Sequence, residues 1–202
     1  NNKNGKITEV YVDDYFNTKK TFKDMETSFT YIDTTDAGKD EINNFYDDYK
    51  SGKKVLDPQF INKKELDASY IAGWKIKGYW YFDKRQGELK YRLLAICPVT
   101  PEARDAGNEN ADVIDLFWVY FPAVRDILHE AKAFNDKNSA MPITFDHLLN
   151  SRRFNGVIYK EENVYGDREI QQYMKDNAQM QLLESERVKE KIRSFESDMW
   201  NY

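Results

Sequence analysis

The chain has 202 residues, of which 35 are acidic and 30 basic, so that its net charge is -5. This length supports one large domain with a conventional hydrophobic core, and the acidic balance argues against a general affinity for nucleic acid. No apolar run approaches the ~20 residues of a membrane span, and the single cysteine, Cys97, excludes an intrachain disulfide. Because Asn1–Gly5 does not resemble a signal peptide, we expect a mature or truncated chain.

The N-terminal third has the least regular pattern. Lys6–Val12 predicts a short strand, whereas Asp13–Asp36 shows no steady period and is expected to be a loop. From Asp40, as an N-cap, apolar residues recur with helical spacing up to Gly52, which predicts a short amphipathic helix. The polar segment Lys53–Ser69 is expected to be irregular surface chain.

Three strand-like runs follow. Trp74–Phe82 alternates with period 2, and Leu89–Cys97 returns after the hairpin loop Asp83–Glu88, so that 74–97 is predicted to form an antiparallel hairpin. Val113–Phe121 is almost entirely β-branched or aromatic, and we predict that it is the central strand of the sheet. The residues expected to face inward on the first strand are Trp74, Ile76, Trp80 and Phe82.

The remaining elements are predicted to be loops and helices. Pro98–Asp112 has the composition of an exposed loop, and Pro122 occupies the first turn of a helix whose apolar stripe ends at Phe134. Thr144 is expected to cap a short helix, Gly156–Lys160 to add a strand, and Asp167 to cap another helix. The stripe after Pro122 consists of Val124, Ile127, Leu128, Ala131 and Phe134.

The clearest helix lies at the C-terminus, from Leu182 onward. Opposite charges recur at i, i+3, and a narrow apolar stripe runs along one side. Burial of that stripe is worth more than the pairs, which contribute only about 0.2–0.5 kcal/mol each. The predicted pairs are Glu184 with Arg187, Glu186 with Lys189 and Glu190 with Arg193, and the stripe is Val188, Ile192, Phe195 and Met199. Trp200 and Tyr202 are expected to fasten the end of the chain. The fold class is therefore α+β, a small, mostly antiparallel sheet covered by helices.

No catalytic or metal-binding motif is complete. His129-Glu130 begins like a zinc-protease helix, but the second histidine would have to stand at Ala133. Gly38-Lys39 lacks the upstream glycine of a phosphate loop. Cys97 lies between apolar neighbours, which favours an inert core thiol over a nucleophile. We therefore expect no catalytic, cofactor-binding or metal-binding residues, no cofactor and no enzymatic activity.

The outward face of the hairpin is the most distinctive candidate surface. Cations alternate there with aromatic rings, as in platforms that bind single-stranded nucleic acid, and a polysaccharide is a second possible ligand. An ordinary antiparallel sheet with one wet face explains the same pattern. The residues concerned are Lys75, Lys77, Tyr79, Tyr81, Lys90 and Arg92.

Several sequence blocks resemble the GldN/PorN family, the gliding-motility and type IX secretion proteins of Bacteroidetes. The resemblance spans about Trp74 to the C-terminus and is looser over residues 1–73. The blocks are Phe82–Arg85, Leu116–Pro122, Phe145–Asp146 with Arg152–Phe154, Asn163–Tyr165, Leu182–Lys189 and Asp198–Trp200.

This resemblance implies a non-enzymatic structural protein in the periplasm, peripheral to the outer membrane. It implies self-association in a ring complex with a GldK/PorK-type lipoprotein, and contact with a GldM/PorM-type motor subunit. It gives no reason to expect nucleic acid or a small-molecule substrate as a partner. Residues 1–202 would form a single GldN/PorN-like domain, with the family's N-terminal region expected to be absent. The nucleic-acid or polysaccharide binding module remains the alternative.

Overall fold

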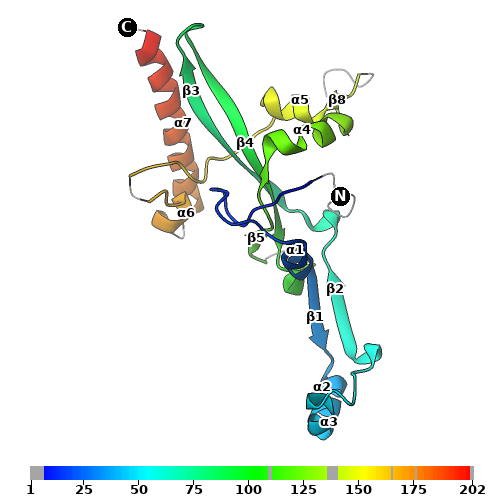
Figure 1. The fold of residues 1–202 in the computed structure, drawn as a ribbon. Coiled ribbons are helices and arrows are strands. Elements are labelled where there is room, and N and C mark those ends of the chain that lie inside the picture. Colours follow the sequence, from blue (N-terminus) through cyan, green and yellow to red (C-terminus); the bar gives the residue numbers. More distant parts are fainter. Residues whose placement is uncertain (1–6, 109–110, 136–140, 165, 176, 201–202) are drawn as a thin grey trace. The chain divides into compact units, whose positions relative to one another are not determined.

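The computed structural model describes residues 7–108, 111–135, 141–164, 166–175 and 177–200. The chain forms two compact units, and we describe each by itself. The first unit comprises Asn1–Lys77 and Leu94–Ile127, and the second comprises Gly78–Leu93 and Leu128–Tyr202. Figure 1 follows the elements in chain order.

The elements confirm an α+β fold with a long C-terminal helix. The α-helices are α1 (Phe22–Phe29), α2 (Asp36–Asn44), α3 (Tyr46–Lys50), α4 (Phe121–Glu130), α5 (Phe145–Asn150), α6 (Ile170–Tyr173) and α7 (Ala178–Trp200). The strands are β1 (Thr30–Thr34), β2 (Ile61–Glu65), β3 (Gly73–Asp83), β4 (Glu88–Pro101), β5 (Val113–Asp115), β6 (Val119–Tyr120), β7 (Lys132–Ala133) and β8 (Ile143–Thr144). Short 3-10 helices are η2 (Pro58–Phe60), η3 (Ala68–Tyr70) and η4 (Ala103–Asp105).

β4 lies at the centre of the largest sheet, whose order is β3-β4-β5 with β6 also pairing β4. The predicted hairpin is therefore confirmed, but the prediction of a central strand over Val113–Phe121 is wrong. The backbone of Trp118 instead exchanges two hydrogen bonds of 2.8 Å with Tyr11, which separates β5 from β6, and Phe121 already begins α4. Ala95, Cys97 and Trp118 form the buried core of the first unit.

Two further predictions near the sheet are wrong in part. Tyr11 makes isolated bridges to Lys19 and Trp118, so the described part of Lys6–Val12 is not a regular strand, and Lys6 lies outside the described residues. The predicted loop Pro98–Asp112 is wrong at its start, because β4 continues through buried residues to Pro101.

A helix and a two-stranded ribbon replace the loop predicted over Asp13–Asp36. Thr21 caps α1 in a capping box: its hydroxyl accepts from Asp24 N, and the Asp24 carboxylate accepts from Thr21 N. β1 then pairs antiparallel with β2, which lies inside the segment Lys53–Ser69 that was predicted to be irregular. Burial alternates in neither strand, since β1 is half-buried except at Ile32 and Asp33 and all of β2 is exposed.

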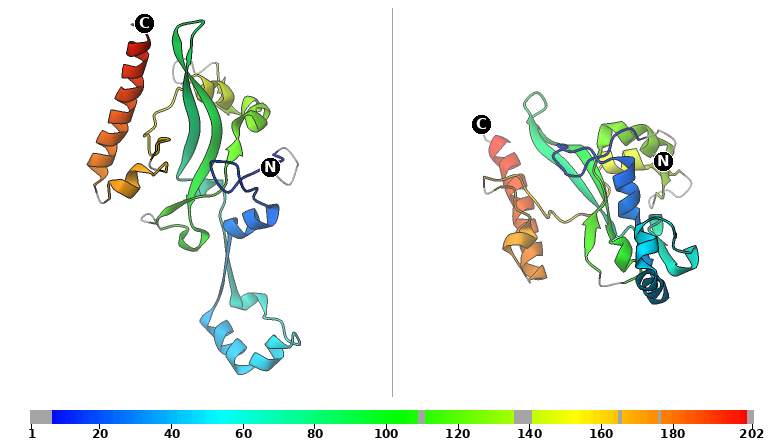
Figure 2. Two further views of the ribbon diagram at one scale, coloured as in Figure 1. Left: turned by 60° about the vertical axis from the view of Figure 1, so that its left-hand side comes forward. Right: turned by 60° about the horizontal axis from the view of Figure 1, so that its bottom comes forward.

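The ribbon carries α2 and α3 at its far end (Figure 2). The prediction that Asp40 caps the helix is wrong: α2 begins at Asp36, and the Thr35 hydroxyl accepts from the backbone N of Gly38. Gly38 is required there, because a Cβ atom would lie 2.8 Å from side-chain carbons of Phe60 and Thr34. The local cap at Thr35 therefore marks the start of the helix, and Gly38 allows the helix to approach the ribbon closely.

Later predictions are confirmed in part. Thr144 caps α5 and Pro122 lies in the first turn of α4, but α4 ends at Glu130, so that Phe134 is 78% exposed instead of extending the stripe. Gly156–Lys160 is wrong as a strand, since only Lys160 makes a bridge, to Glu169. Asp167 does not cap α6; it has a φ of 53°, and Glu169 occupies the N-cap.

The C-terminal helix α7 and its charge pairs are confirmed. All three predicted i, i+3 pairs form, each with an N–O distance of 2.6 Å. Val188 is buried and Ile192 and Met199 are half-buried, but Phe195 is 51% exposed. Trp200 is 66% exposed, so the prediction that it fastens the end of the chain is wrong. Tyr202 lies outside the described residues.

Candidate functional site

Within the described residues, no group of three or more His, Cys, Asp or Glu side chains could hold a metal ion. A depression lined by Glu169, Gln171, Gln172 and Lys175 is open to solvent. Burial raises the pKa of the Cys97 thiol to about 12, so this side chain is neutral at physiological pH. None of the described helices combines the length and apolar character that crossing a bilayer requires.

Within the first unit, the two lysines predicted for the outward face of the hairpin are each held by a carboxylate. Lys75 Nζ lies 2.8 Å from Asp115 Oδ1. Lys77 Nζ lies 3.2 Å from Asp14 Oδ2, donates to the Asp14 carbonyl at 2.8 Å and stands 4.2 Å above the Tyr15 ring. Both lysines are half-buried, so their charges are directed at the protein itself rather than at a ligand.

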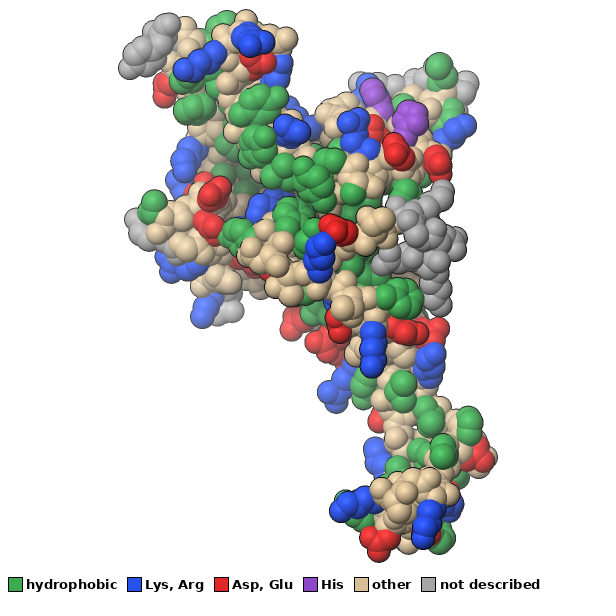
Figure 3. Space-filling view, in the orientation of Figure 1, with side chains coloured by type: hydrophobic (Ala, Val, Ile, Leu, Met, Phe, Trp, Pro, Cys, Tyr) green, Lys and Arg blue, Asp and Glu red, His purple; other side chains and the backbone are tan. Residues whose placement is uncertain are grey.

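The second unit contains the rest of that face. Tyr79 and Tyr81 are 42% and 41% exposed, and their ring centroids are 5.8 Å apart. Lys90 Nζ lies 3.1 Å from Asp83 Oδ2, and this hydrogen bond lowers the pKa of the Asp83 carboxyl. What the face offers outward is therefore a pair of phenol rings, and Arg92 is also exposed. Figure 3 shows hydrophobic side chains gathered along this hairpin.

The opposite face of the hairpin holds Arg152, which the sequence marked only as part of a family-like block. The Trp80 and Tyr91 rings lie 5.2 Å apart, and the Arg152 guanidinium stands 4.5 Å above Trp80 and 6.0 Å from Tyr91. Gly78 makes room for this packing, because a Cβ atom would meet Tyr91 Cζ and its hydroxyl oxygen at 2.3 Å. Burial raises the pKa of Tyr91, which the nearby Arg152 partly offsets.

Arg152 follows α5 in an unusual backbone conformation. Its φ of 53° is left-handed, a region that favours glycine. Arg152 N donates to Leu149 O, and Arg153 N donates to Leu148 O, which is the hydrogen-bond pattern of a Schellman helix end. An arginine in the position where glycine is usual suggests that its side chain compensates for the strain. The signal available in sequence was the absence of glycine after a capped helix.

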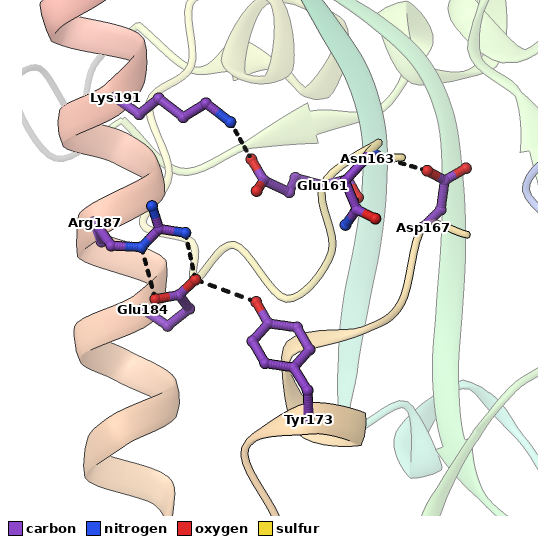
Figure 4. A network of polar contacts seen from close by, with 7 residues as sticks. All are labelled: Glu161, Asn163, Asp167, Tyr173, Glu184, Arg187 and Lys191. Carbon is purple, nitrogen blue, oxygen red and sulfur yellow. Dashed lines mark hydrogen bonds and ion pairs between the residues drawn. The ribbon is translucent and has the colours of Figure 1, made fainter. Parts of the chain in front are cut away.

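A polar network fastens residues 158–173 to α7 (Figure 4). The buried Ser185 hydroxyl accepts from Ile158 N at 2.8 Å. Glu184 accepts two hydrogen bonds from Arg187, of 2.6 and 2.8 Å, and one from the Tyr173 hydroxyl at 3.3 Å. The hydrogen bonds from Arg187 and Tyr173 lower the pKa of the Glu184 carboxyl. The hydrogen bond to Glu184 raises the pKa of the Arg187 guanidinium. The charged groups named here pair within the second unit, which indicates a structural role. Besides the contacts of Glu184, Figure 4 draws Lys191 to Glu161 at 3.4 Å and Asn163 N to Asp167 Oδ1 at 2.7 Å.

The first unit exposes a third surface, on the ribbon and its helices. We define residues 30–65, which contain β1, α2, α3, η2 and β2, as the arm. Several of its large apolar side chains are exposed, and Lys54 is held between Glu41 at 2.9 Å and the Phe45 ring at 3.8 Å. Exposed apolar side chains that gather in one patch are typical of proteins that bind other proteins. The side chains concerned are Ile32, Phe45, Tyr46, Val55 and Ile61.

Comparison with known proteins places the chain in a family. No curated protein is significantly similar to the chain. The family model described as "Gliding motility associated protein GldN" matches residues 1–201. This confirms the resemblance seen in the sequence blocks and extends it over the N-terminal third. The chain therefore belongs to the GldN family of gliding motility associated proteins.

Proposed function

We propose that this gliding motility associated protein is a non-enzymatic, structural component of the type IX secretion machinery. In this proposal it lies in the periplasm, peripheral to the outer membrane, and forms part of a ring with a GldK/PorK-type lipoprotein. It also contacts the periplasmic part of a GldM/PorM-type motor subunit. The observation that carries the proposal is the family match over residues 1–201.

The surfaces are compatible with such a role. A ring needs a heterologous interface, in which two different patches of each subunit are complementary. The tyrosine pair Tyr79 and Tyr81 is one exposed apolar surface, and the arm is another. Tyrosine is enriched in protein interfaces because it combines a large apolar ring with a polar hydroxyl.

The alternative of a polyanion-binding module receives less support. Affinity for nucleic acid depends on cations that are available to phosphate groups. Lys75, Lys77 and Lys90 each pair with a carboxylate, so the face retains little net positive charge. We therefore favour a protein ligand for the tyrosine pair.

Copurification from outer-membrane preparations tests the proposal. A tagged full-length protein is expected to recover the lipoprotein partner and ring particles visible by electron microscopy. Tyr79→Glu combined with Tyr81→Glu should reduce recovery at least tenfold, whereas Tyr70→Glu, at an exposed tyrosine of η3, should not. Recovery of the protein without the lipoprotein would contradict the proposal.

A further inference from the structure

The outer edge of β1 is open to a further strand. In the part of the chain that the structure describes, β1 pairs only with β2. Leu66 N donates to Phe29 O and Thr35 N donates to Phe60 O, so the hydrogen-bonded pairs fall on residues 29, 31, 33 and 35 of this side. Thr30, Ile32 and Thr34 therefore direct their backbone N–H and C=O groups away from β2. Asp33 Oδ1 accepts from Thr34 N, which covers one of these groups.

The two edges of the ribbon differ in the charges they carry. The outward-directed backbone groups of β2 belong to Ile61, Lys63 and Glu65. Antiparallel pairing of β2 with a second β2, centred on Lys63, would place two lysines directly opposite each other, and like charges in that position are destabilising. Lysines on an edge strand are a common protection against such pairing.

β1, in contrast, can pair with a second β1 without a charge conflict. Antiparallel pairing centred on Ile32 places Ile32 opposite Ile32, Thr30 opposite Thr34 and Tyr31 opposite Asp33 of the second copy. No like charges meet, and the branched pairs are favourable in sheets. The centre of pairing also coincides with a residue whose N–H and C=O point outward, as a hydrogen-bonded pair requires.

The ribbon would gain stability from a further strand. A two-stranded ribbon is marginally stable in water, and three or more strands are usually needed for independent stability. All five residues of β2 are exposed, and Ile32 is 62% exposed. A second ribbon would cover Ile32 and complete a sheet of sufficient size.

We propose that two copies of this chain associate through their β1 edges, forming a four-stranded antiparallel sheet in the order β2-β1-β1-β2. The occupant of the edge is a second copy because the strand pairs with itself without a charge conflict. The contact is two-fold and closes with two copies, so it is distinct from the heterologous contact of a ring. It goes beyond the proposed function and does not depend on the lipoprotein.

Cysteine cross-linking tests the register. Opposite residues in a hydrogen-bonded antiparallel pair have Cα atoms about 5.5 Å apart, within the range that a disulfide spans. Ile32→Cys should therefore form a covalent dimer under mild oxidation, whereas the matched control on the other edge, Lys63→Cys, should form none. Native Cys97 is fully buried and does not compete. Equal cross-linking of both variants, or none of Ile32→Cys, would overturn the proposal.

Proline substitution tests the backbone contact. Ile32→Pro removes an outward N–H without removing a bond to β2, and proline is tolerated at such edge positions. Sedimentation of the full chain should show a dimer that this variant weakens at least tenfold, while Lys63→Pro leaves it unchanged. Ile32→Lys, which places two lysines opposite each other, should give the same loss if Ile32→Pro fails to fold by circular dichroism. A monomeric wild-type chain at its highest soluble concentration would refute the pairing, whatever the outcome with the lipoprotein.

Discussion

Replacing Arg152 separates two opposing effects at the end of α5. The side chain stacks on Trp80, while the backbone holds a left-handed φ of 53°. Arg152→Ala removes the stack and keeps the strain, because alanine also disfavours this region. Arg152→Gly removes both. Comparison of the two variants therefore isolates the cost of the backbone conformation.

The magnitudes follow from the distances. A cation 4.5 Å from an indole at an exposed site contributes about 0.5–1 kcal/mol, and the Tyr91 ring, at 6.0 Å, lies at the limit of the interaction. A left-handed backbone costs a residue other than glycine about 1–2 kcal/mol. Replacement by glycine removes this cost, but it also raises the entropy of the unfolded chain, which cancels part of the gain in stability. We expect Arg152→Ala to lower the free energy of unfolding by about 1 kcal/mol, and Arg152→Gly to stay near wild type.

Urea denaturation followed by tryptophan fluorescence measures these differences. Arg152→Ala should lower the midpoint, and the slope should be unchanged in every variant, because a changed slope would indicate a changed unfolded state. Arg153→Ala is the matched control, since it removes a neighbouring exposed arginine and should change stability by less than about 0.5 kcal/mol. If Arg152→Ala were as stable as wild type, the stack would contribute nothing. If it were as stable as Arg152→Gly, the strain argument would be refuted.

Three other outcomes are expected from single sites. Thr100→Val should raise the free energy of unfolding by about 1 kcal/mol in the same urea assay. The reason is that the buried Thr100 Oγ1 finds no hydrogen-bond partner among the described residues. A lower midpoint for this variant would mean that the hydroxyl does have a partner. Gly78→Ala should lower the free energy of unfolding by about 1–3 kcal/mol, because the new Cβ would also lie 2.6 Å from a backbone oxygen. Unchanged stability of this variant would mean that the strand shifts freely. Asp83 and Glu184 have lowered pKa values in the folded state, so their contribution is present above the unfolded value of about 4 and is lost as pH falls through the folded value. Urea midpoints should be level above about pH 5 and fall below pH 4; level midpoints down to pH 3 would contradict the assignment.

Local patterns in the sequence were enough to predict several elements. Helix α7 was predicted from i, i+3 charge pairs and an apolar stripe, and both recur at short spacing along one helix. The β3–β4 hairpin was predicted because alternation and a glycine-containing loop are likewise local signals. The capping residue Thr144 belongs to the same class, since its partner is His147, three residues away.

Tertiary structure decided what depended on distant residues. The backbone of Tyr11 interrupts the run Val113–Phe121, which periodicity alone presents as one strand. The ribbon lacks alternation because all of β2 and two adjacent residues of β1 are exposed, so no hydrophobic pattern marks it. Arg152 and Trp80 are separated by many residues in sequence, and only folding places the guanidinium over the ring. Sequence specifies elements through nearby contacts, whereas surfaces are made by residues that meet only once the chain has folded.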